Sequence, residues 1–262
     1  MAPDGHSRSR RCPALRIAVF PVASRPESRR LRYRCTVSKL RAVGFDLDGT
    51  LFDHRGSATV AVDAFVRTLG ADPSTLLQAV WFDAEDRQFE RWRSGEITFE
   101  EQRRERLRKV LPAFGVATPS ETVALDALFQ AYLAEYERAW RGFPDNEAVL
   151  TSLRRDGLRV GVLTNGNEAQ QRAKLRALGL LDLVDVVCVS ESIGVQKPDA
   201  RAFQFLADRL GAATEDCLFV GDNPSQDVAG ARAAGMRSTL IERYGSEPDD
   251  LGVIVREALL RD

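Results

Sequence analysis

Two kinds of hydrophobic pattern occur along this chain, and each predicts a different kind of structure. Between residues 57 and 140 apolar residues recur at helical spacing, and no strand-like run interrupts them. Glycine and proline residues divide this stretch into four predicted helices, over 57–70, 74–95, 99–115 and 120–140. Thr98 with Glu101 three positions later has the spacing of a capping box, and we expect Ser120 to begin the last of these helices in the same way.

After residue 141 short apolar runs alternate with amphipathic segments. The runs predict strands over 158–166, 183–190, 217–223 and 237–243. The amphipathic segments predict helices over 146–157, 168–179, 199–211 and 227–235. A further strand, Val43–Leu47, has the same character and precedes the helical stretch. Strands that alternate with helices of this length form βαβ units, so we expect an α/β fold with a doubly wound, Rossmann-like parallel sheet and an inserted α-helical bundle.

This pattern divides the chain into three parts. Residues 41–54 and 142–262 are predicted to form the sheet domain, and residues 55–141 the inserted helical domain. Residues 1–40 form a basic segment whose first 36 residues lack usable periodicity, so we expect it to lie outside both domains. Three explanations of this segment remain open: a start assigned too early, with Val37 as the true first residue, an organellar transit peptide, or a disordered tail.

Charge and composition argue against two classes of partner, nucleic acid and membranes. The net charge of −1 is uneven: Met1–Arg41 holds eleven Lys and Arg against two Asp and Glu, and the remaining 26 against 36 leave the body at −10. An acidic body makes nucleic acid an unsuitable partner. No apolar run approaches the length of a membrane span, so we expect a soluble protein without a membrane partner. Cys188 and Cys217 lie in strand-like runs and are expected to be buried, reduced thiols, which favours a cytoplasmic location.

Polar residues follow the ends of four predicted strands. In chain order they are Asp46 and Asp48, Thr164 and Asn165, Lys197 after a short loop, and Asp222 with Asp227. Ligands of an open parallel sheet bind beyond the carboxyl ends of its strands, so we expect these side chains to share one site. Taken singly, Thr164 and Asp227 could each be a helix cap and Lys197 a solvated surface charge. The agreement of all four strand ends favours the shared site.

The residue types at these strand ends suit the transfer of a phosphoryl group. Asp46 and Asp48 point to opposite sides of a strand, so Gly49 must allow the chain to bend before both can face one site. Crowded carboxylates repel one another unless a cation lies among them, and oxygen ligands with surplus negative charge suit Mg²⁺. A carboxylate can also act as a nucleophile, while Lys197 and the Thr164 hydroxyl can contact phosphoryl oxygens.

The segments FDLDGTLFD, LTNG, QKPD and GDNPSQD occur in this order, and together they resemble the motifs of the haloacid dehalogenase superfamily. The resemblance covers about residues 41–241, and it is to the branch whose helical cap is inserted after the first strand. It implies that Asp46 is the nucleophile, which becomes a phospho-aspartate and binds Mg²⁺. It implies that Asp48 is the general acid and base, with its main-chain carbonyl on the metal, and that Lys197 neutralises Asp46 and the phosphate.

The same resemblance assigns roles to the remaining strand ends. Thr164 would bind phosphoryl oxygens with help from the backbone near Asn165. Asp222 and Asp227 would hold the Mg²⁺, the latter directly or through water. The implied activity is that of a phosphatase acting on a small phosphorylated metabolite.

Alternative functions on this fold are a phosphomutase, a haloacid dehalogenase and a non-catalytic binding module. Thr50 after the motif glycine mildly favours a phosphatase over a mutase, and the complete motifs argue against an idle module. Arg91 and Arg93 could reach a second anionic group of the substrate, although an exposed basic helix end is the stronger expectation. His54 is expected to be structural or exposed. The identity of the substrate and the oligomeric state stay open.

Overall fold

A computed structural model of the chain describes residues 40–260, which lie within the second of the chain's two units, Val37–Asp262. The predictions made for residues 1–39 therefore lie outside the described residues. Five strands form one parallel sheet in the order β3-β2-β1-β4-β5. Their bounds are β1 Ala42–Phe45, β2 Arg159–Thr164, β3 Val186–Val189, β4 Cys217–Gly221 and β5 Arg237–Leu240. The predicted parallel α/β sheet is confirmed.

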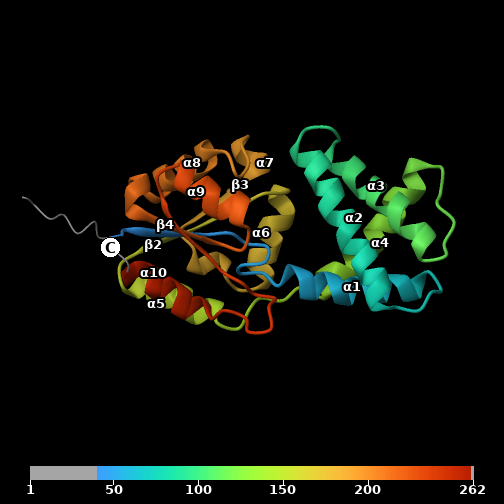
Figure 1. Cartoon of the computed structure of the whole chain (residues 1–262), viewed down its shortest axis with the longest axis horizontal. Helices are drawn as coiled ribbons and strands as arrows, with labels where there is room; N and C mark the ends of the chain where they lie inside the picture. The colour runs from blue at the N-terminus through green and yellow to red at the C-terminus, as the bar shows by residue number, and fades with distance from the viewer. Residues whose placement is uncertain (1–39, 261–262) are drawn as a thin grey trace, which may run out of the picture. The chain divides into compact units, whose positions relative to one another are not determined.

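Helices α1 to α5 lie between β1 and β2 along the chain, and α6 to α10 come after β2, between or after the later strands (Figure 1). The bounds in the insertion are α1 His54–Thr68, α2 Thr75–Arg93, α3 Phe99–Ala113 and α4 Thr122–Arg138. The helices of the sheet domain are α5 Asn146–Arg155, α6 Glu168–Ala177, α7 Ser190–Ile193, α8 Ala200–Leu210, α9 Gly230–Ala233 and α10 Leu251–Leu260. Short helical turns are η1 Leu181–Leu183, η2 Thr214–Asp216 and η3 Pro224–Ala229.

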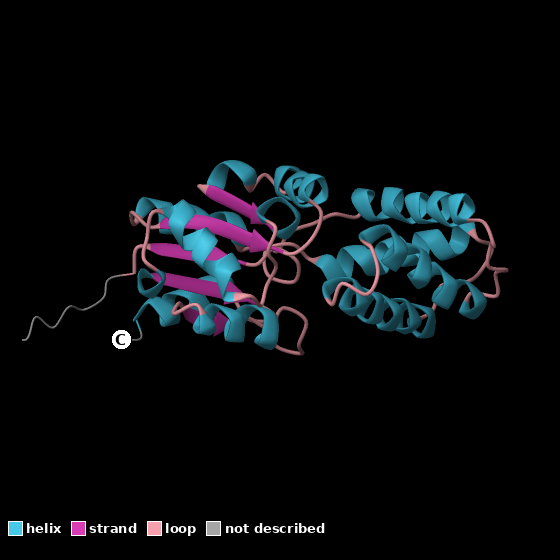
Figure 2. Ribbon diagram, turned by 90° about the horizontal axis from the view of Figure 1, so that it is seen from above, coloured by secondary structure: helices cyan, strands magenta, loops and turns pink. Residues whose placement is uncertain are grey.

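Alternate residues of β1 to β4 belong to different hydrophobic clusters on the two faces of the sheet. Val43 and Phe45 of β1 join a cluster that includes residues of α5 and α10, whereas Ala42 joins a cluster built around α8. Figure 1 places α8 and α9 on one face of the sheet and α5 and α10 on the other, and Figure 2 shows helices packed over and beside the strands. Gly44 faces α8 so closely that a Cβ there would lie 2.6 Å from Leu206. The centre of the sheet, at β1 and β4, is therefore buried on both faces, whereas the edge strand β5 is only partly buried.

The helical insertion has an aromatic centre. Trp81 of α2 lies with its ring centroid 4.2 Å from that of Tyr132, and Phe65 and Phe129 contact the same pair at 5.5–6.5 Å. All four side chains are at most 4% exposed. Buried aromatic side chains of this size contribute strongly to the packing of amphipathic helices. The domain boundaries at 55 and 141 stay a prediction.

Several local features differ from the sequence-based expectations. The capping box at Thr98 and Glu101 is present, but α4 begins at Thr122 and Ser120 does not cap it. The segment after β4 begins as a π-helical turn, η3, and becomes α-helical only at Gly230. Segment 190–193, expected to belong to a strand end and loop, is a short helix, and the helix over 251–260 was not predicted.

Two compositional expectations can be compared with the described residues. Cys188 and Cys217 are buried and free, as expected. Among residues 40–260, no helix combines the length and the apolar character that a bilayer span requires.

Candidate functional site

Asp46 follows β1 directly, and the chain then turns back on itself. The Asp46 N–H donates to the carbonyl of Val220 in β4 at 2.9 Å, which continues the sheet pairing by one residue. Gly49 has a φ of +89°, and its N–H donates to the Phe52 carbonyl at 2.9 Å. A Cβ at Gly49 would lie 2.2 Å from Oδ2 of Asp222. The glycine therefore brings the turn that carries Asp48 against the end of β4.

Lys197 lies between two carboxylates at the centre of the strand ends. Its Nζ contacts Oδ1 of Asp46 and lies 2.6 Å from Oδ1 of Asp227, and the residue is only 3% exposed. Burial lowers the pKa of Lys197, but the charges of Asp227 and Asp46 outweigh burial and raise it above its ordinary value. Lys197 is therefore a buried, charged group rather than a solvated surface lysine.

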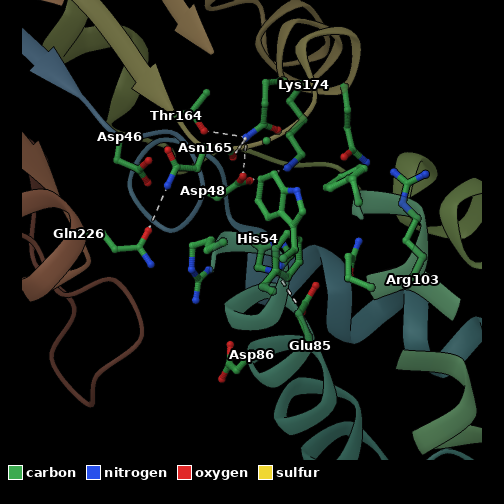
Figure 3. A pocket seen from close by; sticks show the side chains of 18 of the residues that line it. Asp46, Asp48, His54, Glu85, Asp86, Arg103, Thr164, Asn165, Lys174 and Gln226 are labelled. Atoms are coloured by element: carbon green, nitrogen blue, oxygen red, sulfur yellow. Dashed lines mark hydrogen bonds and ion pairs between the residues drawn. The ribbon is translucent and has the colours of Figure 1, made fainter. Parts of the chain in front are cut away.

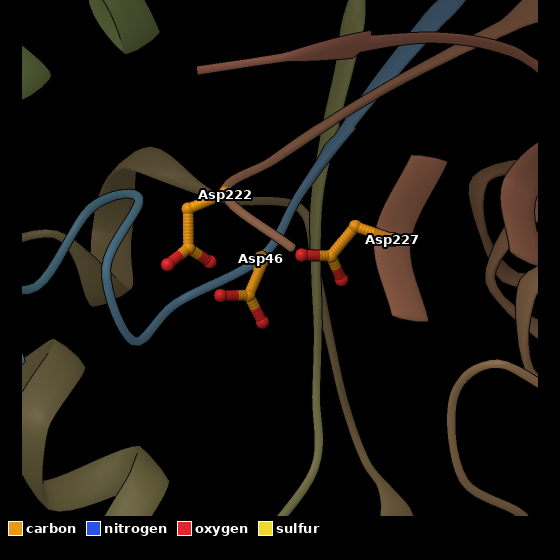
Figure 4. Close-up of side chains that lie close together, drawn as sticks. All are labelled: Asp46, Asp222 and Asp227. Atoms are coloured by element: carbon orange, nitrogen blue, oxygen red, sulfur yellow. The ribbon is translucent and has the colours of Figure 1, made fainter. Parts of the chain in front are cut away.

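Three carboxylates from different elements meet beside this lysine (Figure 4). Asp46, Asp222 and Asp227 each place one oxygen so that all three lie within 4.8 Å of one another. Burial raises the pKa of Asp46 well above its usual range, and burial followed by the charge of Asp227 raises the pKa of Asp222 to about 7. One lysine does not balance three carboxylates, so this oxygen-only donor set fits a hard divalent cation.

Thr164 and Asn165 line the same site from the end of β2. The Thr164 side chain is buried, and its Oγ1 accepts a hydrogen bond of 2.7 Å from Nε2 of Gln171. Asn165 bridges to the Lys197 backbone, because its Nδ2 donates to the Lys197 carbonyl at 3.0 Å and its Oδ1 accepts from the Lys197 N–H at 2.9 Å. Asn165 therefore ties the two strand-end segments together. Asn167, rather than Thr164, caps α6.

Asp227 is likewise not a helix cap. Its Oδ2 accepts a hydrogen bond from the Asn223 N–H at 3.0 Å while its Oδ1 contacts Lys197. The cap of η3 is Asn223, whose Oδ1 accepts from the N–H groups of Ser225 and Gln226. All the residues expected at the strand ends are therefore brought together, and none of the three single-residue alternatives describes them.

Sequence reasoning missed two residues of α6 that contact Asp48. Lys174 Nζ lies 2.6 Å from Oδ1 of Asp48, and Gln171 Nε2 lies 2.8 Å from its Oδ2. Burial raises the pKa of Asp48, but the positive charges of Lys174 and His54, with these hydrogen bonds, outweigh burial and lower it. Gln171 and Lys174 are three residues apart and so share one helix face. This spacing, on the helix that follows Thr164, is the sequence pattern from which the two residues could have been identified.

A cavity of about 240 Å³ joins the strand ends to side chains of α1–α4 (Figure 3). His54 lies on its helical side, with Nδ1 2.6 Å from the Tyr136 hydroxyl and Nε2 3.2 Å from Oε2 of Glu85. Glu85 also accepts from Nη1 of Arg106 at 2.6 Å. Burial lowers the pKa of His54, but the charge of Glu85 outweighs it and raises the pKa. Both ring nitrogens of His54 thus contact side chains of other helices, as expected of a structural residue.

Arg91 and Arg93 form ion pairs within their own segment. Arg91 contacts Glu96 at 2.6 Å and Gln88 at 2.9 Å, and Arg93 contacts Glu90 at 2.6 Å. Arg93 lines the cavity and Arg91 does not. The two arginines thus behave mainly as the basic helix end that was expected.

Comparisons with known proteins agree with this geometry. A family model described as haloacid dehalogenase-like hydrolase matches residues 40–235. A Mycobacterium tuberculosis (strain CDC 1551 / Oshkosh) protein named as a phosphatase is 46% identical over 116 residues, which are 44% of this chain and 53% of the relative. The alignment thus spans about half the length of that relative.

Other matches extend over more of the chain. A ribulose-1,5-bisphosphate 5-phosphatase of Halopiger xanaduensis is 32% identical over 205 residues, which cover 77% of this chain and 84% of the relative. A solved structure of a HAD-hydrolase from Bacillus subtilis, bound to magnesium, matches with a TM-score of 0.68 and 22% identity, over 80% of this chain and 90% of the other. At that identity the structural match shows the common fold.

Proposed function

The chain belongs to the haloacid dehalogenase-like hydrolases, and we propose that it is a Mg²⁺-dependent phosphatase that hydrolyses a small phosphorylated metabolite through a phospho-Asp46 intermediate. The observation that carries the proposal is the buried Asp46 carboxylate, which contacts Lys197 and shares its surroundings with Asp222 and Asp227. The relatives support hydrolysis of a phosphate ester as the reaction, because one is named as a phosphatase and the other as a ribulose-1,5-bisphosphate 5-phosphatase.

The residues divide the reaction into two displacements. In the first, an oxygen of Asp46 bonds to phosphorus while the bond from phosphorus to the ester oxygen breaks, and Asp48 gives its proton to that leaving oxygen. In the second, a water oxygen attacks phosphorus, the bond to Asp46 breaks, and Asp48 takes the proton of the water. Inorganic phosphate and free Asp46 result. Lys197 and the Thr164 hydroxyl contact the phosphoryl oxygens throughout.

Asp48 must carry a proton for the first step and lack one for the second. Its contacts with Lys174 and Gln171 lower its pKa, which suits the proton acceptor of the second step. The arrival of a phosphate dianion beside it raises the pKa, because a nearby like charge disfavours the ionised carboxylate. The same residue can therefore serve both steps.

The metal would be held by Asp46, Asp222 and Asp227, with the main-chain carbonyl of Asp48. It supplies positive charge that stabilises the phosphoryl group in the transition state. The fit rests on the oxygen-only donor set and on the crowding of Asp46, Asp222 and Asp227. Burial, and after it the charges of neighbouring carboxylates, raise the pKa values of Asp46 and Asp222, and a cation would offset both effects.

A haloacid dehalogenase is the nearest alternative on this fold. Halide leaves without a proton, so that reaction has no use for a proton donor at the position of Asp48. The Asp48 carboxylate lines the cavity beside Asp46 and is oriented by two hydrogen bonds, which favours the phosphatase. We further propose that residues 55–141 act as a cap, whose side chains select the substrate.

A screen of small phosphate monoesters, with release of inorganic phosphate as the readout, tests this function. We expect turnover with Mg²⁺ and none with a chelator such as EDTA. Asp46→Asn should reduce release to background, because it removes the nucleophile and one metal ligand while it keeps the side-chain shape. The exposed Asp72→Asn is the matched control and should retain the wild-type rate. Substantial turnover by a folded Asp46→Asn protein would contradict the phospho-aspartate.

A further inference from the structure

Five lysine and arginine side chains line the cavity, and four of them contact carboxylates. These four are Arg93, Arg106, Lys174 and Lys197, whose partners lie at 2.6 Å or closer. The fifth is Arg103 of α3 (Figure 3). Within residues 40–260, Arg103 has neither a hydrogen-bonded carboxylate nor any ion pair at contact distance.

Two aromatic rings hold the guanidinium of Arg103 in place. Its central carbon lies 4.6 Å from the ring centroid of Phe99 and 5.3 Å from that of Phe129, and both rings also line the cavity. Cation–π contacts of this kind use no N–H hydrogen bond to a polar atom, so they leave the N–H edge of the guanidinium available to a ligand. That edge is a fork of donors whose geometry matches a carboxylate or a phosphate.

The charges around Arg103 favour an added anion. Its pKa is lowered by burial first and then by the positive charge of Arg106. The charges of Glu100 and Asp126 raise the pKa again only in part, and Asp126 is itself held by Arg104 through hydrogen bonds of 2.7 and 2.8 Å. Glu85 is likewise held by Arg106 and His54. A partly buried cation without a partner is costly, and a ligand that supplies an anion removes the cost.

We propose that Arg103 binds a second anionic group, a carboxylate or a phosphate, of a compact substrate whose phosphoryl group lies at Asp46. The proposal rests on the phosphatase function proposed above. One cavity of about 240 Å³ is lined by both Asp46 and Arg103. This volume lies below the roughly 300–1,000 Å³ of sites for drug-sized ligands, so the substrate is a small molecule with an anion at each end.

Three substrates with the same three-carbon chain test the proposal. They are the phosphate ester of 3-hydroxypropionate, propane-1,3-diol bisphosphate and n-propyl phosphate, which carry a carboxylate, a second phosphate and no second anion. We expect wild type to have its highest kcat/KM for one of the two with a second anion, and the comparison identifies which anion. Arg103→Met, which keeps apolar contact with Phe99 and Phe129, should lower that kcat/KM about 10–100-fold, as expected for one lost charge-assisted hydrogen-bonded contact.

Two further variants separate charge from structure. Arg103→Lys keeps the charge without the fork, so it should recover part of the lost kcat/KM. Lys109→Met also removes one positive charge from α3, but from an exposed position outside the cavity. It should leave kcat/KM for all three substrates within about 3-fold of the wild-type values. Thermal unfolding of each variant confirms that the fold is kept.

The outcomes distinguish this inference from the function on which it rests. If Arg103→Met lowers kcat/KM for n-propyl phosphate as much as for the others, or if wild type has no preference for a second anion, Arg103 does not bind one. In both cases hydrolysis of n-propyl phosphate by wild type leaves the phosphatase function standing. Failure of wild type to hydrolyse any phosphate monoester would overturn both proposals.

Discussion

Glu85 is the buried acid that joins α1, α2 and α3, and its replacement by Gln gives a sharp test of the structure. One carboxylate oxygen lies 2.6 Å from Arg106 and the other 3.2 Å from His54, and the side chain is only 7% exposed. Burial raises the pKa of Glu85, but the charges of Arg106 and His54 outweigh burial and lower it from 4.5 to about 2. The ionised form is therefore strongly favoured in the folded protein.

The pKa shift sets the magnitude of the expected effect. The fall in the pKa of Glu85 from 4.5 to about 2 corresponds to about 3 kcal/mol of unfolding free energy. Loss of one partner of a buried ion pair costs about 3–5 kcal/mol, since the other charge stays buried without compensation. Both arguments predict that the unfolding free energy of Glu85→Gln is about 3 kcal/mol lower than that of wild type at pH 7. Glu90→Gln on the same helix is the control, and it should lose less than about 1 kcal/mol because Glu90 is 70% exposed.

The loss should depend on pH in a defined direction. Because the folded-state pKa of Glu85 is depressed, its stabilisation is complete above pH 4.5 and declines as the pH falls toward 2. The charge of Glu85 raises the pKa of His54. The contribution of His54 to stability is therefore complete below about pH 6.5 and is lost as the pH rises through its folded-state pKa. The difference between wild type and Glu85→Gln should therefore be largest near pH 5 and smallest near pH 3.

Urea unfolding, followed by tryptophan fluorescence at pH 8, 5 and 3, measures these differences. Trp81 is a suitable reporter, because the Arg106 guanidinium lies 5.5 Å from its ring centroid. Equal losses in Glu85→Gln and Glu90→Gln would refute the reasoning. So would a loss in Glu85→Gln that stays constant from pH 5 to pH 3.

Two further predictions concern the strand-end site. Asp222→Ala and Asp227→Ala should each raise the Mg²⁺ concentration for half-maximal activity, with the larger effect at Asp222. Unchanged metal dependence in both variants would mean that the two residues have structural roles only. Asp48→Asn should slow hydrolysis of an alkyl phosphate by about 10²–10⁴-fold, and it should slow the initial burst with nitrophenyl phosphate much less, because that leaving group departs without a proton. Equal slowing of both bursts would argue against Asp48 as the proton donor.

The sheet and its strand-end residues could be predicted because a simple geometric rule links them. Parallel strands place their carboxyl ends at one edge, so polar residues just after apolar runs must gather there. Asp46, Asp222, Asp227 and Lys197 are found together for this reason. Lys174 follows no such rule, since the direction of a helical side chain depends on how the helix is rotated against the sheet.

The π-helical turn η3 shows how a site can override local sequence preference. The segment after Asp227 has helical periodicity, and an α-helix from that residue was the natural prediction. In the structure both Asp227 oxygens are engaged, one by Lys197 and one by the Asn223 N–H, and Asn223 in turn caps the turn that follows. These side-chain contacts hold six residues in a wider turn, as is frequent at functional sites.

The sequence of α3 contains a pattern that indicates Arg103 as a further candidate site residue, although no motif includes it. Arg103 and Arg106 are in phase with Leu107 and Val110, which are fully buried, so both arginines fall on the apolar stripe of α3. An arginine on such a stripe needs a partner, because a buried charge without one is costly. Arg106 has Glu85 on α2, a pairing that only the contact between the two helices reveals. Because no comparable partner faces Arg103 among the described residues, its partner is best sought in the substrate.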